Sequence, residues 1–136
     1  MLSPADHAKA ADRLITAATE RRQAEQLSKT WPTINFDDAY AIQNLVIERR
    51  VAGGRKIVGH KIGLTSKAMQ RSSGIDEPDY GVLLDDMVLA DGAKIKAASF
   101  CVPRVEVELC FVLSKPLKGP GVSLIDVLRA TEYVVC

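Results

Sequence analysis

The spacing of hydrophobic residues changes at Gly53-Gly54, and this change most constrains the fold of the chain. Before the glycine pair, apolar residues recur at helical spacing over residues 39–46. After it, short apolar runs of strand length predominate. Helices followed by strands predict an α+β chain, with a helical region over residues 1–54 and a strand-containing region over residues 55–136.

Two helices are predicted in the helical region. Ser3 followed by Pro4 is typical of a capped helix start, and we expect this first helix to run to about Leu27. Its apolar stripe is thin, so we expect it to lie on the surface or against a partner subunit. Asn35 with Asp38 three residues later predicts a second capped helix, which ends at the glycine pair.

The second region combines several short apolar runs with turn residues. We expect strands over residues 57–64, 82–89 and 101–113 and a buried strand from residue 132, with a helical turn capped by Ser66 and a third helix capped by Ser123. The last apolar run reaches Cys136 without a turn residue or polar tail. We therefore expect the sequence to be a fragment of a larger domain.

Composition excludes several classes of partner. The 136 residues are 47% hydrophobic and 26% charged, which is enough apolar material for a packed core. Eighteen basic and seventeen acidic residues leave a net charge of +1, so electrostatics offer no case for nucleic acid or an anionic membrane. No run is long enough to span a bilayer, and the N-terminus lacks the apolar core of a signal peptide. A cytoplasmic protein with a small-molecule partner is predicted.

The cysteines indicate neither a disulfide framework nor a zinc site. Cys101, Cys110 and Cys136 are odd in number and widely spaced. We expect reduced and mostly buried thiols.

A pair of carboxylates lies in the predicted strand Arg104–Cys110. Side chains alternate along a strand, so Glu106 and Glu108 would share one face, about 6.5–7 Å apart at their Cα atoms. Two buried carboxylates this close need a cation, and oxygen ligands favour a hard ion such as Mg²⁺ or Mn²⁺. A strand with a solvated polar face explains the same spacing, and the spacing alone favours that simpler interpretation.

Two further segments carry candidate chemistry. Lys61 lies between Gly59 and Gly63, and glycines allow a backbone or ligand to approach closely. A lysine in a low-dielectric cleft can orient a carboxylate or transfer a proton, although a solvated strand lysine is commoner. Asp79 and Tyr80 lie in a turn after Pro78, where an acid and a phenol can be held near a substrate, although turn acids usually only bond the backbone.

Three segments together resemble successive motifs of one enzyme family. Residues 59–70 (Gly-His-Lys-Ile-Gly-Leu-Thr-Ser-Lys-Ala-Met-Gln), 77–81 (Glu-Pro-Asp-Tyr-Gly) and 103–108 (Pro-Arg-Val-Glu-Val-Glu) resemble the 2-oxo-acid hydratases and decarboxylases of the fumarylacetoacetate-hydrolase superfamily, as do residues 38–43 in the second helix. The resemblance implies N-terminal helices followed by a mixed β-sheet of the fumarylacetoacetate-hydrolase type, incomplete in this chain.

The resemblance also implies a site. It assigns a Mg²⁺ or Mn²⁺ ion to Glu106, Glu108 and a third acidic ligand that would follow Cys136, and proton transfer to Lys61 and Asp79. The implied substrate is a small 2-oxo acid, and the implied assembly is a homo-oligomer.

The implied activity is a hydro-lyase reaction that adds water to a 2-oxo-alkenoate or dienoate during the breakdown of aromatic compounds. Decarboxylation of a 2-oxo-3-enedioate is the alternative within the family. An inactive, truncated remnant is the alternative from another class.

Overall fold

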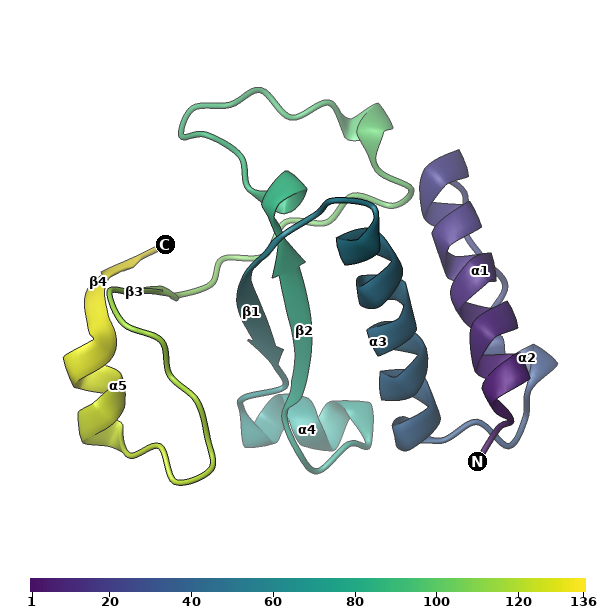
Figure 1. Ribbon diagram of the computed structural model, residues 1–136, viewed down its shortest axis with the longest axis horizontal. Coiled ribbons are helices and arrows are strands. Elements are labelled where there is room, and N and C mark those ends of the chain that lie inside the picture. Colours follow the sequence, from purple (N-terminus) through teal and green to yellow (C-terminus); the bar gives the residue numbers. More distant parts are fainter. The chain divides into compact units, whose positions relative to one another are not determined.

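A computed structural model describes residues 1–136 and confirms an α+β chain (Figure 1). Its contacts form two compact units, Met1–Val102 and Pro103–Cys136. The helices and strands of the first unit are α1 (Pro4–Glu20), α2 (Leu27–Thr30), α3 (Phe36–Ala52), β1 (Ile57–Gly63), α4 (Lys67–Ser73) and β2 (Asp79–Leu84), with 3-10 turns η1 (Asp85–Met87) and η2 (Ala97–Ser99). The second unit contains β3 (Cys110–Leu113), α5 (Leu124–Ala130) and β4 (Thr131–Val135). A domain boundary after residue 54 stays a prediction.

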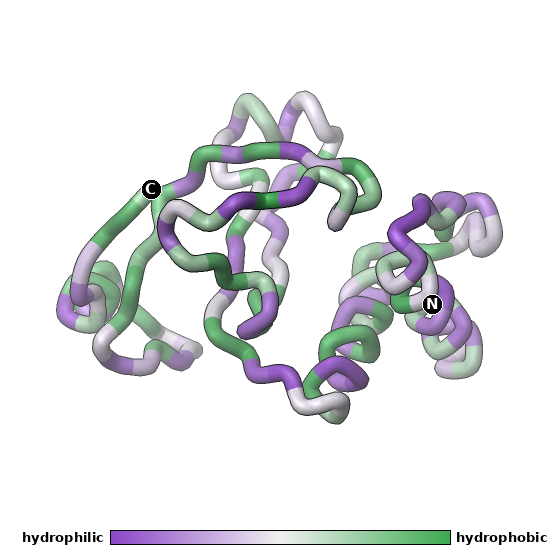
Figure 2. The backbone as a smooth tube through the Cα atoms, turned by 90° about the horizontal axis from the view of Figure 1, so that it is seen from above, coloured by the Kyte–Doolittle hydropathy of each residue, from purple (hydrophilic) through white to green (hydrophobic).

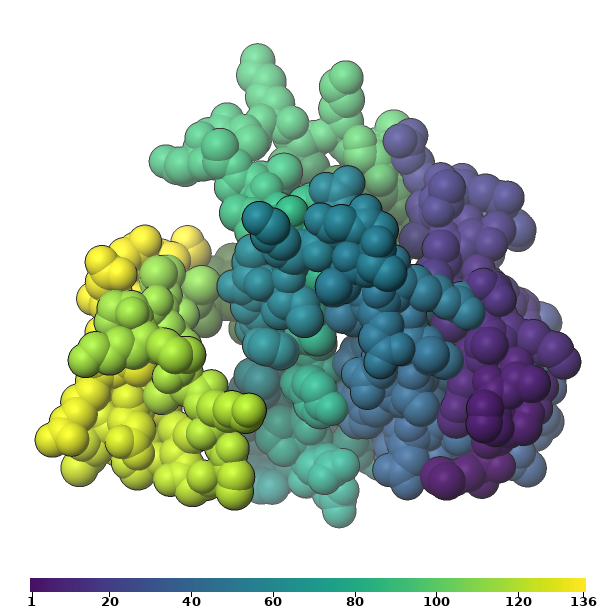
Figure 3. All heavy atoms as spheres, viewed as in Figure 1, coloured from purple at the N-terminus to yellow at the C-terminus, as the bar shows by residue number.

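Helices α1 and α3 pack side by side and form the core of the first unit (Figures 1 and 3). Ala10 and Ala11 of α1 are fully buried against Ile42 of α3, which is 1% exposed. Small alanine side chains allow the two helices to approach closely, and larger apolar residues then pack around the contact. Helix α1 therefore packs its thin stripe against α3 of its own chain while most of its other residues stay exposed or half-buried, which fits a surface helix, and a contact with a partner subunit stays a prediction.

Helix α1 is shorter than predicted. It ends at Glu20 because Arg21 adopts a left-handed conformation with φ of 55°, and the N–H groups of Arg21 and Arg22 bond the carbonyls of Ala18 and Ala17. This is the usual geometry of a helix C-terminus, but a glycine normally occupies the left-handed position. The residues up to Leu27 are therefore not part of α1.

A buried carboxylate ties α1 to α3. Asp38, which is fully buried, accepts hydrogen bonds of 2.8 Å from the Leu2 N–H and from His7 Nε2, and one of 3.2 Å from the Asn35 N–H. Burial alone would raise the pKa of Asp38, but these hydrogen bonds outweigh it and hold the pKa below its ordinary value. The charged carboxylate therefore fastens the start of the chain to the first turn of α3.

Strands β1 and β2 form an antiparallel pair. Lys61 lies opposite Gly81, and Gly63 lies opposite Asp79. Strand β2 begins earlier and ends earlier than predicted, because the chain turns into η1 after Leu84. The predicted strand over residues 82–89 is correct only for its first three residues.

Acidic residues after β2 bond the β1–β2 pair to neighbouring segments. Asp85 Oδ1 accepts a 3.1 Å hydrogen bond from the Lys56 N–H, which holds the pKa of Asp85 low, and the Asp85 N–H donates to the Lys56 carbonyl. The carboxylate of Asp86 pairs with Arg50 near the end of α3 and with Arg55. The β1–β2 pair is therefore bonded to the C-terminal end of α3.

In the second unit, β3 pairs with β4 in antiparallel fashion, and α5 lies between them in sequence. The predicted long strand over residues 101–113 is reduced to Cys110–Leu113. The physical reason is hydrogen bonding: β4 pairs only with these four residues, and no other strand of this unit lies beside residues 103–109. Ser123 caps α5 as predicted and shares a capping box with Asp126.

The second unit exposes much of its apolar surface. Val105 is 95% exposed and Val107 86%, and Figure 2 shows the hydrophobic stretch that leads to the C-terminus. The predicted buried strand is therefore present as β4 but is not buried. All three cysteines are exposed, so the expectation of buried thiols was also wrong. No helix of the chain is both long and apolar enough to cross a bilayer.

The capping box of α3 provides a test of the helical core. Asn35 Oδ1 accepts a 2.9 Å hydrogen bond from the Asp38 N–H. We expect Asn35→Ala to lower the free energy of unfolding by about 1 kcal/mol, because this N–H loses its partner. Asn35→Ser, which keeps an acceptor, is the control, and urea unfolding measures both variants. Equal stability of the alanine and serine variants would contradict the role of the cap.

Candidate active site

Lys61 and Asp79 lie on the same face of the β1–β2 pair. Residues that face each other across antiparallel strands share a face, and so do residues two apart along a strand. Lys61 opposes Gly81, and Asp79 is two residues from Gly81, so the two side chains are diagonal neighbours. Diagonal positions are about 7–8 Å apart, a distance that a lysine side chain can span. The structure therefore brings together two of the four predicted site residues.

Each of these side chains lies across a glycine. A Cβ on Gly63 would overlap Asp79 Oδ1 and lie 3.1 Å from Asp79 Cγ. A Cβ on Gly81 would lie 3.3 Å from Lys61 Cγ. The glycines thus leave the space that the acid and the lysine occupy. Both Lys61 and Asp79 are exposed, so the low-dielectric cleft that would favour a catalytic lysine is not formed by this chain alone.

The turn after β1 is held by a buried amide. Leu64 has φ of 52°, a conformation that is uncommon for a residue with a side chain. Gln70 of α4 is 4% exposed and donates a 2.7 Å hydrogen bond to the Leu64 carbonyl, while Lys67 Nζ donates to Gln70 Oε1. Ser66 caps α4, which is longer than the single predicted turn. This bonding fixes the end of the strand that carries Lys61.

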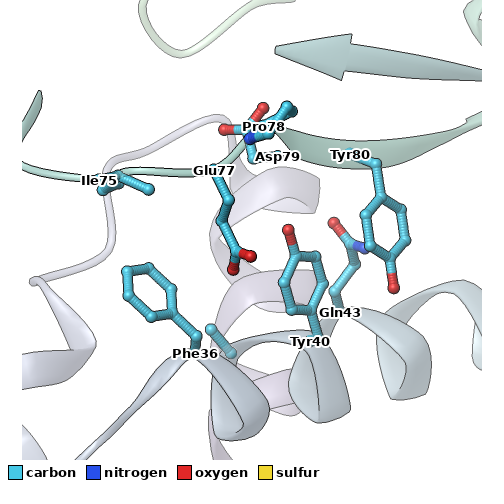
Figure 4. A pocket seen from close by; sticks show the side chains of 9 residues that line it. Phe36, Tyr40, Gln43, Ile75, Glu77, Pro78, Asp79 and Tyr80 are labelled. Atoms are coloured by element: carbon cyan, nitrogen blue, oxygen red, sulfur yellow. The ribbon is translucent and has the colours of Figure 1, made fainter. Parts of the chain in front are cut away.

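A pocket of about 220 Å³ opens between α3 and the start of β2 (Figure 4). Asp79 is one of its lining residues. Tyr40 of α3 stacks on Tyr80 of β2, with ring centroids 4.6 Å apart and planes 11° from parallel. Gln43, one turn after Tyr40, extends its amide beside both rings, and Glu77 points toward α3 (Figure 4).

The sequence analysis did not identify Tyr40 or Gln43 as site residues. The available signal was the resemblance over residues 38–43, which includes both of them. That signal does not show that a helix and a strand 40 positions apart in sequence would meet, as the stacked rings of Tyr40 and Tyr80 show.

Glu106 and Glu108 belong to the second unit and lie outside its strands. Their predicted placement on one strand face is therefore wrong in this structure, because β3 begins only at Cys110. Both are exposed, so neither carboxylate bears the cost of burial away from water. No group of three or more His, Cys, Asp or Glu side chains is arranged to hold a metal ion. The pair has suitable oxygen chemistry, but this chain does not complete a metal site.

Comparison with known proteins identifies relatives over nearly the whole chain. The 2-oxo-hept-4-ene-1,7-dioate hydratase of Escherichia coli is 54% identical over 129 residues, which are 95% of this chain and 48% of the relative. The 2-keto-4-pentenoate hydratase of Paraburkholderia xenovorans is 41% identical over 134 residues, 98% of this chain and 50% of the relative. No protein-family model matches.

A solved structure also matches. The 4-oxalocrotonate decarboxylase of Pseudomonas putida G7, complexed with magnesium and adipate, superimposes with a TM-score of 0.91 at 34% identity, over 98% of this chain and 51% of that one. Over nearly its whole length, the chain is similar to the 2-oxo-acid hydratases and decarboxylases that these proteins represent. Among them, the E. coli hydratase has more than half its aligned residues in common with this chain. The chain spans about half the length of the relatives it matches.

The contact between Asp79 and Gly63 can be tested by substitution. We expect Gly63→Ala to displace the Asp79 side chain, because the added methyl group overlaps the carboxylate, with little change in the free energy of unfolding, because the exposed carboxylate can turn away. Gly59→Ala is a matched control on the same strand, since its Cβ would meet only Leu83 Cδ1 at an ordinary 3.7 Å. Amide chemical shifts and urea unfolding report both effects. Equal behaviour of the two variants would refute the close approach.

Proposed function

We propose that this chain supplies part of the active site of a metal-dependent hydratase. The reaction adds water to a 2-oxo-alkenoate or dienoate, such as 2-oxo-hept-3-ene-1,7-dioate, and gives a 4-hydroxy-2-oxo diacid in the breakdown of aromatic compounds. The observation that carries the proposal is the shared face of β1 and β2, where Lys61 and Asp79 lie diagonally across Gly81 and Gly63. The hydratase names of the relatives support the reaction type.

A divalent ion forms part of this proposal. Glu106 and Glu108 would hold Mg²⁺ or Mn²⁺, with further oxygen ligands from outside residues 1–136, because two carboxylates fall short of the octahedral coordination that Mg²⁺ demands. Two matching structures of 4-oxalocrotonate decarboxylase, one complexed with magnesium and one with calcium, support a divalent cation. When bound, the ion would polarise the 2-oxo group and stabilise negative charge on its oxygen.

Lys61 would bind the substrate and Asp79 would transfer a proton. The ammonium group of Lys61 would attract the carboxylate of the substrate and hold it at the shared face of β1 and β2. The carboxylate of Asp79 would accept a proton from the attacking water or deliver one to the substrate carbon. Their diagonal placement allows one small substrate to contact both groups, and the two roles could be exchanged.

A decarboxylase is the second candidate. The match to 4-oxalocrotonate decarboxylase, with a TM-score of 0.91, favours it, since decarboxylation would also develop negative charge on the 2-oxo oxygen and need the same stabilisation. A third candidate is an inactive remnant. Exposure of Val105, Val107 and Leu109, together with the missing three-ligand cluster, favours a chain that needs further protein to function.

The remaining attributes follow the hydratase assignment. We propose a cytoplasmic protein whose partner is a small 2-oxo acid and which assembles as a homo-oligomer. The near-neutral net charge of +1 supports a small ligand over nucleic acid or an anionic membrane.

A chimera tests the proposed reaction. Residues 1–136 are fused to the part of the E. coli hydratase that they do not cover, and the absorbance of 2-oxo-hept-3-ene-1,7-dioate is followed with Mg²⁺. We expect turnover that a chelator removes, while Glu106→Gln lowers it by more than about 100-fold, since loss of a direct ligand costs at least as much as loss of an outer partner. Carbon dioxide release from 4-oxalocrotonate, a 2-oxo-3-enedioate whose distal carboxylate is placed so that its loss leaves a dienolate, would instead identify the decarboxylase.

The control for this variant is Glu48→Gln on the exposed side of α3, which we expect to leave turnover unchanged. Circular dichroism confirms that each protein is folded. A folded chimera without turnover would refute the hydratase proposal, and full turnover by the Glu106 variant would refute the metal assignment.

A further inference from the structure

The pocket between α3 and β2 contains a polar group whose hydrogen-bonding capacity the protein does not use. Gln43 Nε2 is buried and has no hydrogen-bond partner, alone among the buried side-chain nitrogen and oxygen atoms of residues 1–136. Leaving a buried amide N–H unsatisfied costs free energy, and native proteins rarely tolerate it without a functional reason. An oxygen acceptor that binds in the pocket would remove this cost.

The amide of Gln43 lies close to the face that carries Lys61 and Asp79. Its Oε1 atom is 4.0 Å from the point where a Cβ on Gly81 would lie, and Lys61 Cγ is 3.3 Å from that same point. Asp79 itself lines the pocket together with Gln43. A ligand oxygen bonded to Gln43 would therefore be a near neighbour of both candidate catalytic groups.

Aromatic rings form the walls next to this amide. Tyr40 and Tyr80 stack at 4.6 Å, and the Gln43 amide lies beside them (Figure 4). Flat unsaturated groups pack well against such rings, and binding pockets commonly combine apolar walls with one or two oriented polar groups. The volume of about 220 Å³ suits a short carbon chain.

The charges around the pocket restrict the ligand further. Glu77 and Asp79 both line it, so a second carboxylate would be repelled there. A neutral carbonyl or hydroxyl oxygen would not suffer this repulsion.

We infer that Gln43 is a substrate-binding residue, whose Nε2 donates a hydrogen bond to an uncharged oxygen of a 2-oxo acid while the carbon chain packs against Tyr40 and Tyr80. This inference rests on the proposed function and adds a specificity-determining contact to it. The distal carboxylate of a diacid would lie outside this pocket.

Nuclear magnetic resonance of the 136-residue chain tests the contact without metal or turnover. The probe is 2-oxopentanoate, an unreactive 2-oxo acid, titrated into the millimolar range. We expect saturable shifts of the Gln43 side-chain amide and of the Tyr40 and Tyr80 rings. Gln43→Leu should weaken binding at least about fivefold, because one hydrogen bond is lost. Gln23→Leu, in the exposed segment after α1, is the control and should leave the affinity unchanged.

A stability measurement separates binding from a structural role. Gln43→Leu should keep or raise the free energy of unfolding, because it removes an unsatisfied buried donor. Gln43→Glu keeps the side-chain shape but replaces the donor with an acceptor, and it should also lose binding. The inference is overturned by unchanged affinity in these variants, by the absence of saturable shifts in the natural chain, or by a clear loss of stability in Gln43→Leu.

The outcomes remain distinct from those for the hydratase reaction. Turnover by the chimera without binding at Gln43 would retain the hydratase and refute this contact. Binding that depends on Gln43, with no turnover by the folded chimera, would retain the contact and refute the reaction.

Discussion

The pairing of two glycines with two candidate catalytic side chains across β1 and β2 is the constraint on which the candidate site depends. Gly63 leaves the space that Asp79 occupies, and Gly81 leaves the space crossed by the stem of Lys61. Because the register of an antiparallel pair decides which side chains share a face, the same pairing brings an acid and a base together. A side chain at either glycine would move one of these groups away from the other.

Helix α3 is anchored by contacts on several sides, and it contacts the β1–β2 pair between these anchors. One side of the helix buries Ile42 against α1, and its first turn is bonded through Asp38 to the start of the chain. Near its end, Arg50 pairs with Asp86 just beyond β2. Between these anchors, Tyr40 and Gln43 face the strand. The walls of the pocket therefore come from a well-anchored helix and from the start of β2, which would otherwise be exposed.

Local signals in the sequence predicted the features that depend on neighbouring residues. The caps at Asn35, Ser66 and Ser123 are confirmed, since each side chain bonds a backbone N–H three residues later. The resemblance also named Lys61 and Asp79 as candidates; their catalytic roles stay a prediction, and the register shows only that the two side chains share a face.

Features that depend on distant partners were not predictable in this way. Strand β3 is shorter than its apolar pattern because a strand exists only where another strand pairs with it. The end of α1 is a local feature, but the sequence does not mark it, because Arg21 and not a glycine adopts the left-handed conformation there. The pocket needs two segments far apart in sequence to meet, and no pattern within either segment shows that meeting.

The register of β1 against β2 is the property that most directly tests this account. Cross-strand nuclear Overhauser effects in the 136-residue chain would measure it. We predict contacts that pair Lys61 with Gly81 and Gly63 with Asp79. A shift by one residue, which would pair Asp79 with Ile62, would place the acid on the face opposite Lys61 and contradict the shared site.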